Sequence, residues 1–167
     1  MHGKMHFEAP WSRQLKWITA LTTLLLLGIP LILLSRAPAE HSAVYSAATM
    51  LPVVILAVTA LFAVRGYTIE DAALLVVRPG WNTRIPLTGL QSVEIKPDAM
   101  RGSIRLFGNG GLFGFIGLFR NSALGRYRAF VTDAANCVVL RFADRTLVVT
   151  PDRPQQFAAI LKDSIEP

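Results

Sequence analysis

The sequence predicts an α+β, mainly β fold, in which a hairpin of two transmembrane helices precedes a small barrel or sandwich of antiparallel strands capped by a C-terminal helix. Three observations predict it. Two long uncharged runs lie near the start of the 167-residue chain, short β-rich runs follow them, and the last segment places its apolar residues at helical spacing. A hydrophobic share of 52%, a mean hydropathy of +0.43 and a charged share of only 17% are typical of a membrane protein.

The apolar runs are the first two elements. Residues 17–34 and 43–64 contain no charged side chain, and a helix needs about 20 such residues to cross the hydrocarbon core. Pro30 and Pro52 lie inside the runs, where membrane helices tolerate proline. A buried helical hairpin would seldom stay uncharged on every face. A cleaved signal peptide ending near 37–39 is the other alternative, but the apolar region of such a peptide is only about 7–15 residues long.

Basic residues beside the runs predict the orientation, because cytoplasmic segments carry an excess of Lys and Arg. Three basic residues precede the first run and three follow the second, whereas the connector has one arginine offset by a glutamate. The six are Lys4, Arg13, Lys16, Arg65, Arg78 and Arg84. The predicted order is a cytoplasmic basic tail over 1–16, a transmembrane helix over 17–34, an external connector over 35–42, a second transmembrane helix over 43–64 and a cytoplasmic domain over 65–167. Both termini are then cytoplasmic.

The cytoplasmic segment reads as short strands followed by one helix. Strands are predicted near 67–69, 74–78, 82–86, 90–95, 104–107, 113–119, 127–132, 138–142 and 146–149. Asp152 is the expected N-cap of the last helix, with Pro154 in its first turn. Phe157 and Leu161 belong to the apolar face of that helix. The helix is therefore expected to pack on the strands.

Three tracts of this segment resemble the bacterial pleckstrin-homology (PH) domain family. They read GYTIEDAALLVVRPGWNTRIPLTGLQSVEI, RGSIRLFGNGGLFGFIGLFRNSALGRYRAFVTD and VVLRFADRTLVVTPDRPQQF, and together they cover about Gly66 to Leu161. The resemblance implies two packed antiparallel sheets of about seven strands with a C-terminal capping helix. It also implies a multi-pass protein of the bacterial inner membrane and a binding scaffold without catalytic residues.

The glycine-rich stretch FGNGGLFGFIGLF raises the question of a phosphate-binding loop. Gly108 and Gly110 begin a G-x-G pattern, but position 113, where the third glycine would lie, is Phe113. Gly108, Gly110 and Gly111 are instead expected to form a tight turn that leads into a bent strand. The phenylalanines over 107–119 fit either a packed core or insertion into a membrane, and the sequence leaves both open.

Catalytic and metal-binding patterns are not found in the domain. Cys137 is the only cysteine, and the histidines at 2, 6 and 41 precede the domain. The carboxylates are scattered, without a pair spaced for acid and base roles. We therefore expect no enzyme activity, no catalytic residue, no metal and no cofactor. The basic pI near 10.1 comes without a recognised nucleic-acid motif, and nucleic acid is not an expected partner.

An arginine-rich interval, residues 101–128, is the candidate contact surface. No acidic residue lies between Asp98 and Asp133, and five arginines fall inside: Arg101, Arg105, Arg120, Arg126 and Arg128. The expected function is a membrane-anchored binding or assembly module that engages a protein partner or self-associates. The alternative is contact with anionic lipid headgroups through this interval, since each basic side chain near such a surface contributes about 1 kcal/mol. A third possibility is an accessory subunit of a membrane complex.

Overall fold

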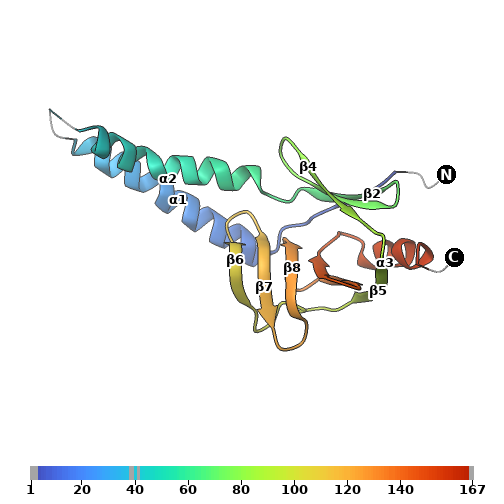
Figure 1. Cartoon of the computed structure of the whole chain (residues 1–167). Helices are drawn as coiled ribbons and strands as arrows, with labels where there is room; N and C mark the ends of the chain where they lie inside the picture. The colour runs from blue at the N-terminus through green and yellow to red at the C-terminus, as the bar shows by residue number, and fades with distance from the viewer. Residues whose placement is uncertain (1–3, 38–39, 41, 166–167) are drawn as a thin grey trace.

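The computed structural model describes residues 4–37, 40 and 42–165. Helices α1 (Arg13–Ser35) and α2 (Ala43–Leu61) lie side by side and project from a β-rich domain as a hairpin (Figure 1). Both are long and apolar enough to cross a membrane, and only 11% and 6% of their most apolar stretches are buried. A core helix of a soluble protein would be mostly buried. The two apolar helices expected from the sequence are therefore present as candidate membrane spans.

The helix bounds differ slightly from the predicted runs. Helix α1 begins at Arg13, four residues before the apolar run, because the Ser12 hydroxyl accepts a hydrogen bond from the Leu15 N–H and caps the helix. Ser42 caps α2 in the same way through the Tyr45 N–H. Helix α2 ends at Leu61, three residues before the end of its run. Positions 1–3 of the expected tail and positions 38, 39 and 41 of the expected connector lie outside the described residues.

Two sheets form the domain. The first has four antiparallel strands in the order β1 (Met5–Glu8), β2 (Gly66–Glu70), β3 (Ala73–Val77) and β4 (Asn82–Pro86). The second has the order β5 (Leu90–Ile95), β9 (Val138–Phe142), β10 (Thr146–Val149), β8 (Gly125–Val131), β7 (Phe115–Asn121) and β6 (Ile104–Gly110). All neighbours are antiparallel except β8 and β10, which are parallel. The sheets are separate, so the fold is a sandwich and not a closed barrel.

Strand β1 comes from the segment expected as a basic tail. It pairs with β2, so the residues just before α1 and those just after α2 lie in one sheet. Phe7 is its one buried residue and packs edge-on against Phe157, with the ring centroids 5.1 Å apart. The strand therefore contributes to the core of the domain as well as to its edge.

Helix α3 (Pro154–Asp163) closes the domain, as the sequence predicts. Its buried residues Phe157 and Leu161 join the main core, which lies between the two sheets. The prediction that Asp152 caps α3 is wrong. The cap position is Arg153, whose side chain makes no capping hydrogen bond, and Asp152 Oδ1 instead accepts from the Glu8 N–H at 3.1 Å. The carboxylate thus holds the end of β1 against the start of α3.

The sheets are joined by hydrogen bonds through one buried tyrosine. Tyr67 on β2 donates its hydroxyl to the carbonyl of Phe130 on β8 and accepts from the Thr150 N–H, at 2.5 Å and 3.1 Å. A second apolar cluster lies on the other face of the second sheet, around Tyr127, and includes Phe119. Strands β7 and β8 are therefore held between two cores, which fixes the positions of the residues on both of their faces.

Candidate functional site

Three of the five candidate arginines lie on one face of the second sheet. Residues that pair across antiparallel strands share a face, and alternate residues along a strand share it too. Arg120 on β7 pairs with Arg126 on β8. Leu118, two residues along β7, pairs with Arg128. The structure therefore brings Arg120, Arg126 and Arg128 together, with their charges in neighbouring positions on the same surface.

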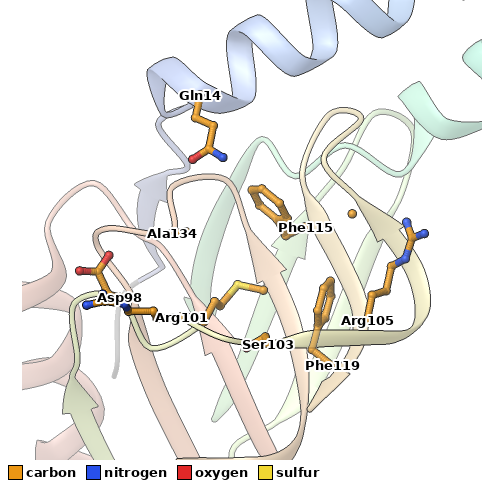
Figure 2. Close-up of a pocket in the computed structure, with 10 residues that line it drawn as sticks. Gln14, Asp98, Arg101, Ser103, Arg105, Phe115, Phe119 and Ala134 are labelled. Atoms are coloured by element: carbon orange, nitrogen blue, oxygen red, sulfur yellow. The ribbon is translucent and has the colours of Figure 1, made fainter. Parts of the chain in front are cut away.

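The other two candidate arginines line a different cavity. Arg105 pairs with Phe119, on the opposite face from Arg120, and Arg101 lies in the turn before β6. Figure 2 shows both beside a cavity of about 710 Å³ under the first turn of α1, where Gln14 lies above Phe115. The expected contact surface of five arginines is therefore two surfaces, separated by the sheet itself.

Polar side chains support the floor of this cavity. The Asn121 side-chain amide donates to Ser103 Oγ at 3.0 Å and to the Ala99 carbonyl at 2.8 Å. Ser103 in turn shares a hydrogen bond of 2.5 Å with the Tyr127 hydroxyl, and burial raises the pKa of that tyrosine. The chain of bonds holds Ser103, which lines the cavity, and fixes the turn that carries Arg101.

A basic groove of about 540 Å³ lies between the edge strand β4 and strand β8. Its charged lining is Arg84, Arg126, Arg128, Arg145 and Asp144. Arg145 pairs with Asp144 at 3.7 Å and stacks on Phe142, whereas in the described part of the chain no ion pair involves the other three arginines. The groove therefore carries unneutralised positive charge and fits an anionic ligand.

The edge strand β6 exposes apolar side chains. Ile104 is 70%, Leu106 45% and Phe107 78% exposed. In Figure 1 this strand is the outermost of its sheet, close to the base of the helical hairpin. Phe115 and Phe119, in contrast, are at least partly covered. Phe119 is thus packed, whereas Phe107 is exposed and its insertion into a membrane stays a prediction.

Most of the glycine-rich stretch is strand and not turn. Gly108 and Gly110 lie in β6, and the turn covers 111–114, closed by the Gly111 N–H donating to the Gly114 carbonyl at 3.0 Å. The expectation that all three glycines form the turn is therefore corrected: only Gly111 does. Gly108 pairs with Gly117, and two separate features require glycine at both positions. Both have positive φ, and an added Cβ would collide with a carbonyl oxygen of the neighbouring strand.

The turn at 111–114 contacts helix α1 directly. The Thr19 hydroxyl donates to the Gly111 carbonyl at 3.3 Å and accepts from the Phe113 N–H at 3.1 Å. The ring of Phe113 also lies edge-on to Trp11, 6.1 Å between centroids. The stretch that resembled a phosphate loop is a docking loop between the domain and the first helix.

The one thiol lies in the core. Cys137 is fully buried and donates to the Ala134 carbonyl at 3.3 Å, and burial raises its pKa to about 12. A thiol that stays protonated is a poor nucleophile. Within the described ranges, no three His, Cys, Asp or Glu side chains come together as metal ligands.

Sequence reasoning missed Arg145 and treated Arg84 only as an orientation signal. Both line the basic groove with Arg126, although they lie far from it in the sequence. Only the packing of the two sheets brings Arg84 and Arg126 together, since β4 and β8 belong to different sheets. A linear sequence shows clusters of charge along the chain and carries no direct signal for a cluster of this kind.

Comparison with known proteins identifies the domain. The family model described as "Bacterial PH domain" matches residues 65–165, which is more than half of the chain. No curated protein and no solved structure gives a match. The matched range covers β2 to α3, whereas β1 and the two apolar helices precede it. The family match, the two sheets and the capping helix agree, and the chain belongs to the bacterial PH domain family.

Proposed function

We propose that the protein is a non-enzymatic binding module, anchored in the bacterial inner membrane, which holds an acidic protein segment in its basic groove. The observation that carries this proposal is the set of Arg84, Arg126 and Arg128 around one groove, none of them paired with a carboxylate in the described residues. PH-like domains serve as binding scaffolds, and the family membership supports that general role.

The geometry of β4 supports an extended ligand. Within the described residues this strand is the last of its sheet and pairs only with β3. Its outer edge can accept another strand, although the Pro86 carbonyl already accepts a hydrogen bond of 3.2 Å from Arg145 Nη2. Thr83 to Pro86 of β4 line the groove. An acidic segment added beside β4 would gain backbone hydrogen bonds and bring its carboxylates to the arginines.

The pairing of β1 with β2 supports the predicted orientation. Residues 5–8 precede α1 and residues 66–70 follow α2, yet they form one ladder. If both helices span the membrane, β1 and β2 lie on the same side of it. The basic residues near both spans favour the cytoplasmic side for these strands. The groove would then face cytoplasmic proteins while the helices retain the module at the membrane.

The test uses the full chain in nanodiscs of uncharged lipid and a fluorescent glutamate-rich peptide. Arg126→Glu and Arg84→Glu should each weaken peptide binding by about tenfold or more, because an attraction becomes a repulsion. Arg101→Glu, on the other face of the sheet, is the matched control and should leave the affinity unchanged. Equal affinities for all four proteins would refute the proposal.

A second candidate function is contact between strand β6 and the anionic leaflet. The exposed side chains of Ile104, Leu106 and Phe107 favour it, since an inserted apolar side chain contributes about 1.5–3 kcal/mol. A spin label at Phe107→Cys in nanodiscs would report its depth. A higher collision rate of the spin label with oxygen than with a water-soluble nickel complex would support contact between β6 and the leaflet. A higher collision rate with the nickel complex would exclude that contact.

A further inference from the structure

An apolar cavity separates the end of helix α2 from the second sheet. It measures about 540 Å³, within the range of small-molecule sites. Val58 and Phe62 line it from α2 and its C-cap, and Phe107, Ile116 and Leu118 line it from the sheet. In Figure 1 the end of α2 lies beside the hairpin of β6 and β7. We call this space the span cavity.

Two arginines contribute the charged lining of the span cavity, beside the polar side chains of Thr59 and Asn109. The guanidinium carbons of Arg78 and Arg128 lie 5.4 Å and 5.3 Å from the centroid of the same ring, Phe130. Arg78 is only 7% exposed, and within the described residues neither arginine has a carboxylate partner. Two cations therefore lie around one ring without a counter-charge, and Arg128 acts electrostatically on Arg78, an arrangement that favours an anion.

Arg78 is held in place by neutral groups. Its Nε donates to Thr83 Oγ1 at 3.0 Å and its Nη1 donates to the Phe62 carbonyl at 2.8 Å. Neither bond uses Nη2. Burial and the neighbouring Arg128 lower the pKa of Arg78. A bound phosphate would accept hydrogen bonds from the remaining donors and offset the repulsion between the two guanidinium groups.

The apolar walls continue onto the candidate span. Val58 lies in the last turn and a half of α2, where that helix would leave the bilayer, and Phe107 at the rim is largely exposed. An acyl chain can therefore reach the cavity from the leaflet without crossing a charged surface. A free phosphate would use the arginines and leave these walls uncovered. The combination of an apolar wall and a cationic end fits an amphiphile.

We propose that the span cavity binds one anionic phospholipid of the adjoining leaflet, with its phosphate between Arg78 and Arg128 and an acyl chain along Val58, Phe62 and Phe107. The inference rests on the membrane anchoring of the proposed function and not on the acidic partner. This lipid site differs from a general electrostatic attraction of the domain to the anionic leaflet, because it requires a single lipid molecule bound in the span cavity. The bound lipid would fill the space between the helix and the domain.

The test counts lipids retained by the full chain. Protein delipidated in detergent is offered phosphatidylglycerol or phosphatidylcholine and examined by native mass spectrometry. One phosphatidylglycerol should be retained in preference to phosphatidylcholine. Arg78→Gln and Arg128→Gln should each lower the retention about tenfold. Thermal unfolding of each variant shows whether it folds. The Arg128 side chain is exposed and, in the described structure, makes no hydrogen bond, so Arg128→Gln tests the site without disturbing a buried residue.

The control is Arg126→Gln, on the same strand as Arg128 but lining only the basic groove. It should keep the lipid while losing affinity for the acidic peptide, so a failure of one proposal is distinguishable from a failure of the other. Equal retention of both lipids, or retention unchanged by both cavity variants, would overturn the lipid site. Binding of glycerol phosphate as tight as that of the lipid would also overturn it.

Discussion

The hydroxyl of Thr19, one and a half turns into helix α1, accepts a hydrogen bond of 3.1 Å from the backbone N–H of Phe113 at the tip of the β6–β7 turn. The same hydroxyl donates to Gly111 at the other end of the turn. One side chain of a candidate span thus satisfies two backbone groups of the domain.

Thr19→Val should therefore loosen the loop from the helix. The change keeps the shape of the side chain and removes both hydrogen bonds, at about 0.5–1.5 kcal/mol for each bond. Hydrogen exchange in nanodiscs measures the effect directly, and the amide of Phe113 should lose protection while the strands keep theirs. Thr49→Val is the control, since that hydroxyl donates within its own helix, to the Tyr45 carbonyl. Unchanged exchange at Phe113 would contradict the docking role.

Gly117→Ala should destabilise the domain because its Cβ would collide with the Phe107 carbonyl. The backbone there has a φ of 138°, which adds strain of roughly 1–3 kcal/mol. Gly125→Ala is the milder comparison, since Gly125 has a φ of 67°, in the left-handed region, and no atom lies within 4 Å of the added Cβ. Thermal unfolding should show a larger loss for Gly117→Ala than for Gly125→Ala. Equal losses would mean that the close approach of the strands is not needed.

Phe7→Ala should be costly although residue 7 lies outside the family match. The side chain is 1% exposed and packs on Phe157, and such a truncation in a core costs about 3–5 kcal/mol. Met5→Ala is the control on the same strand, because Met5 is exposed and its loss should stay within about 0.5 kcal/mol. For the same reason, a fragment of residues 65–167 should unfold at a lower temperature than the full chain. Similar unfolding temperatures would contradict the role of β1.

The sequence predicted the strands well and the site poorly, for one physical reason. The predicted strand at 82–86 and the observed β4 coincide, because alternation and turn residues are local signals. Strand β1 was missed because its four residues have one buried side chain, Phe7, and their partner lies beyond both helices. Arg78 and Arg128 meet over one ring only after β3 and β8 have packed together. Contacts between sheets leave no periodic pattern in the sequence.

The stability of the domain should fall as the pH rises from about 9 to about 12. Burial raises the pKa of Cys137 from 9.0 to about 12 and that of Tyr67 from 10.0 to about 12. In this window both groups stay protonated in the folded protein and ionise in the unfolded chain. The folded state then binds more protons, and the free energy of unfolding decreases with pH. Below about pH 9 both states are protonated and these groups contribute no slope.

Unfolding temperatures of the full chain in detergent, measured at steps through that window, check this expectation. Cys137→Ala should make the dependence on pH shallower, even though the smaller side chain lowers stability at neutral pH. The native thiol should also resist alkylation at about pH 8, since it is both buried and protonated, and it should react only when denaturant opens the core. Rapid alkylation of the folded protein, or a slope that Cys137→Ala leaves unchanged, would show that the thiol is not held in a dry core between β9 and the turn before it.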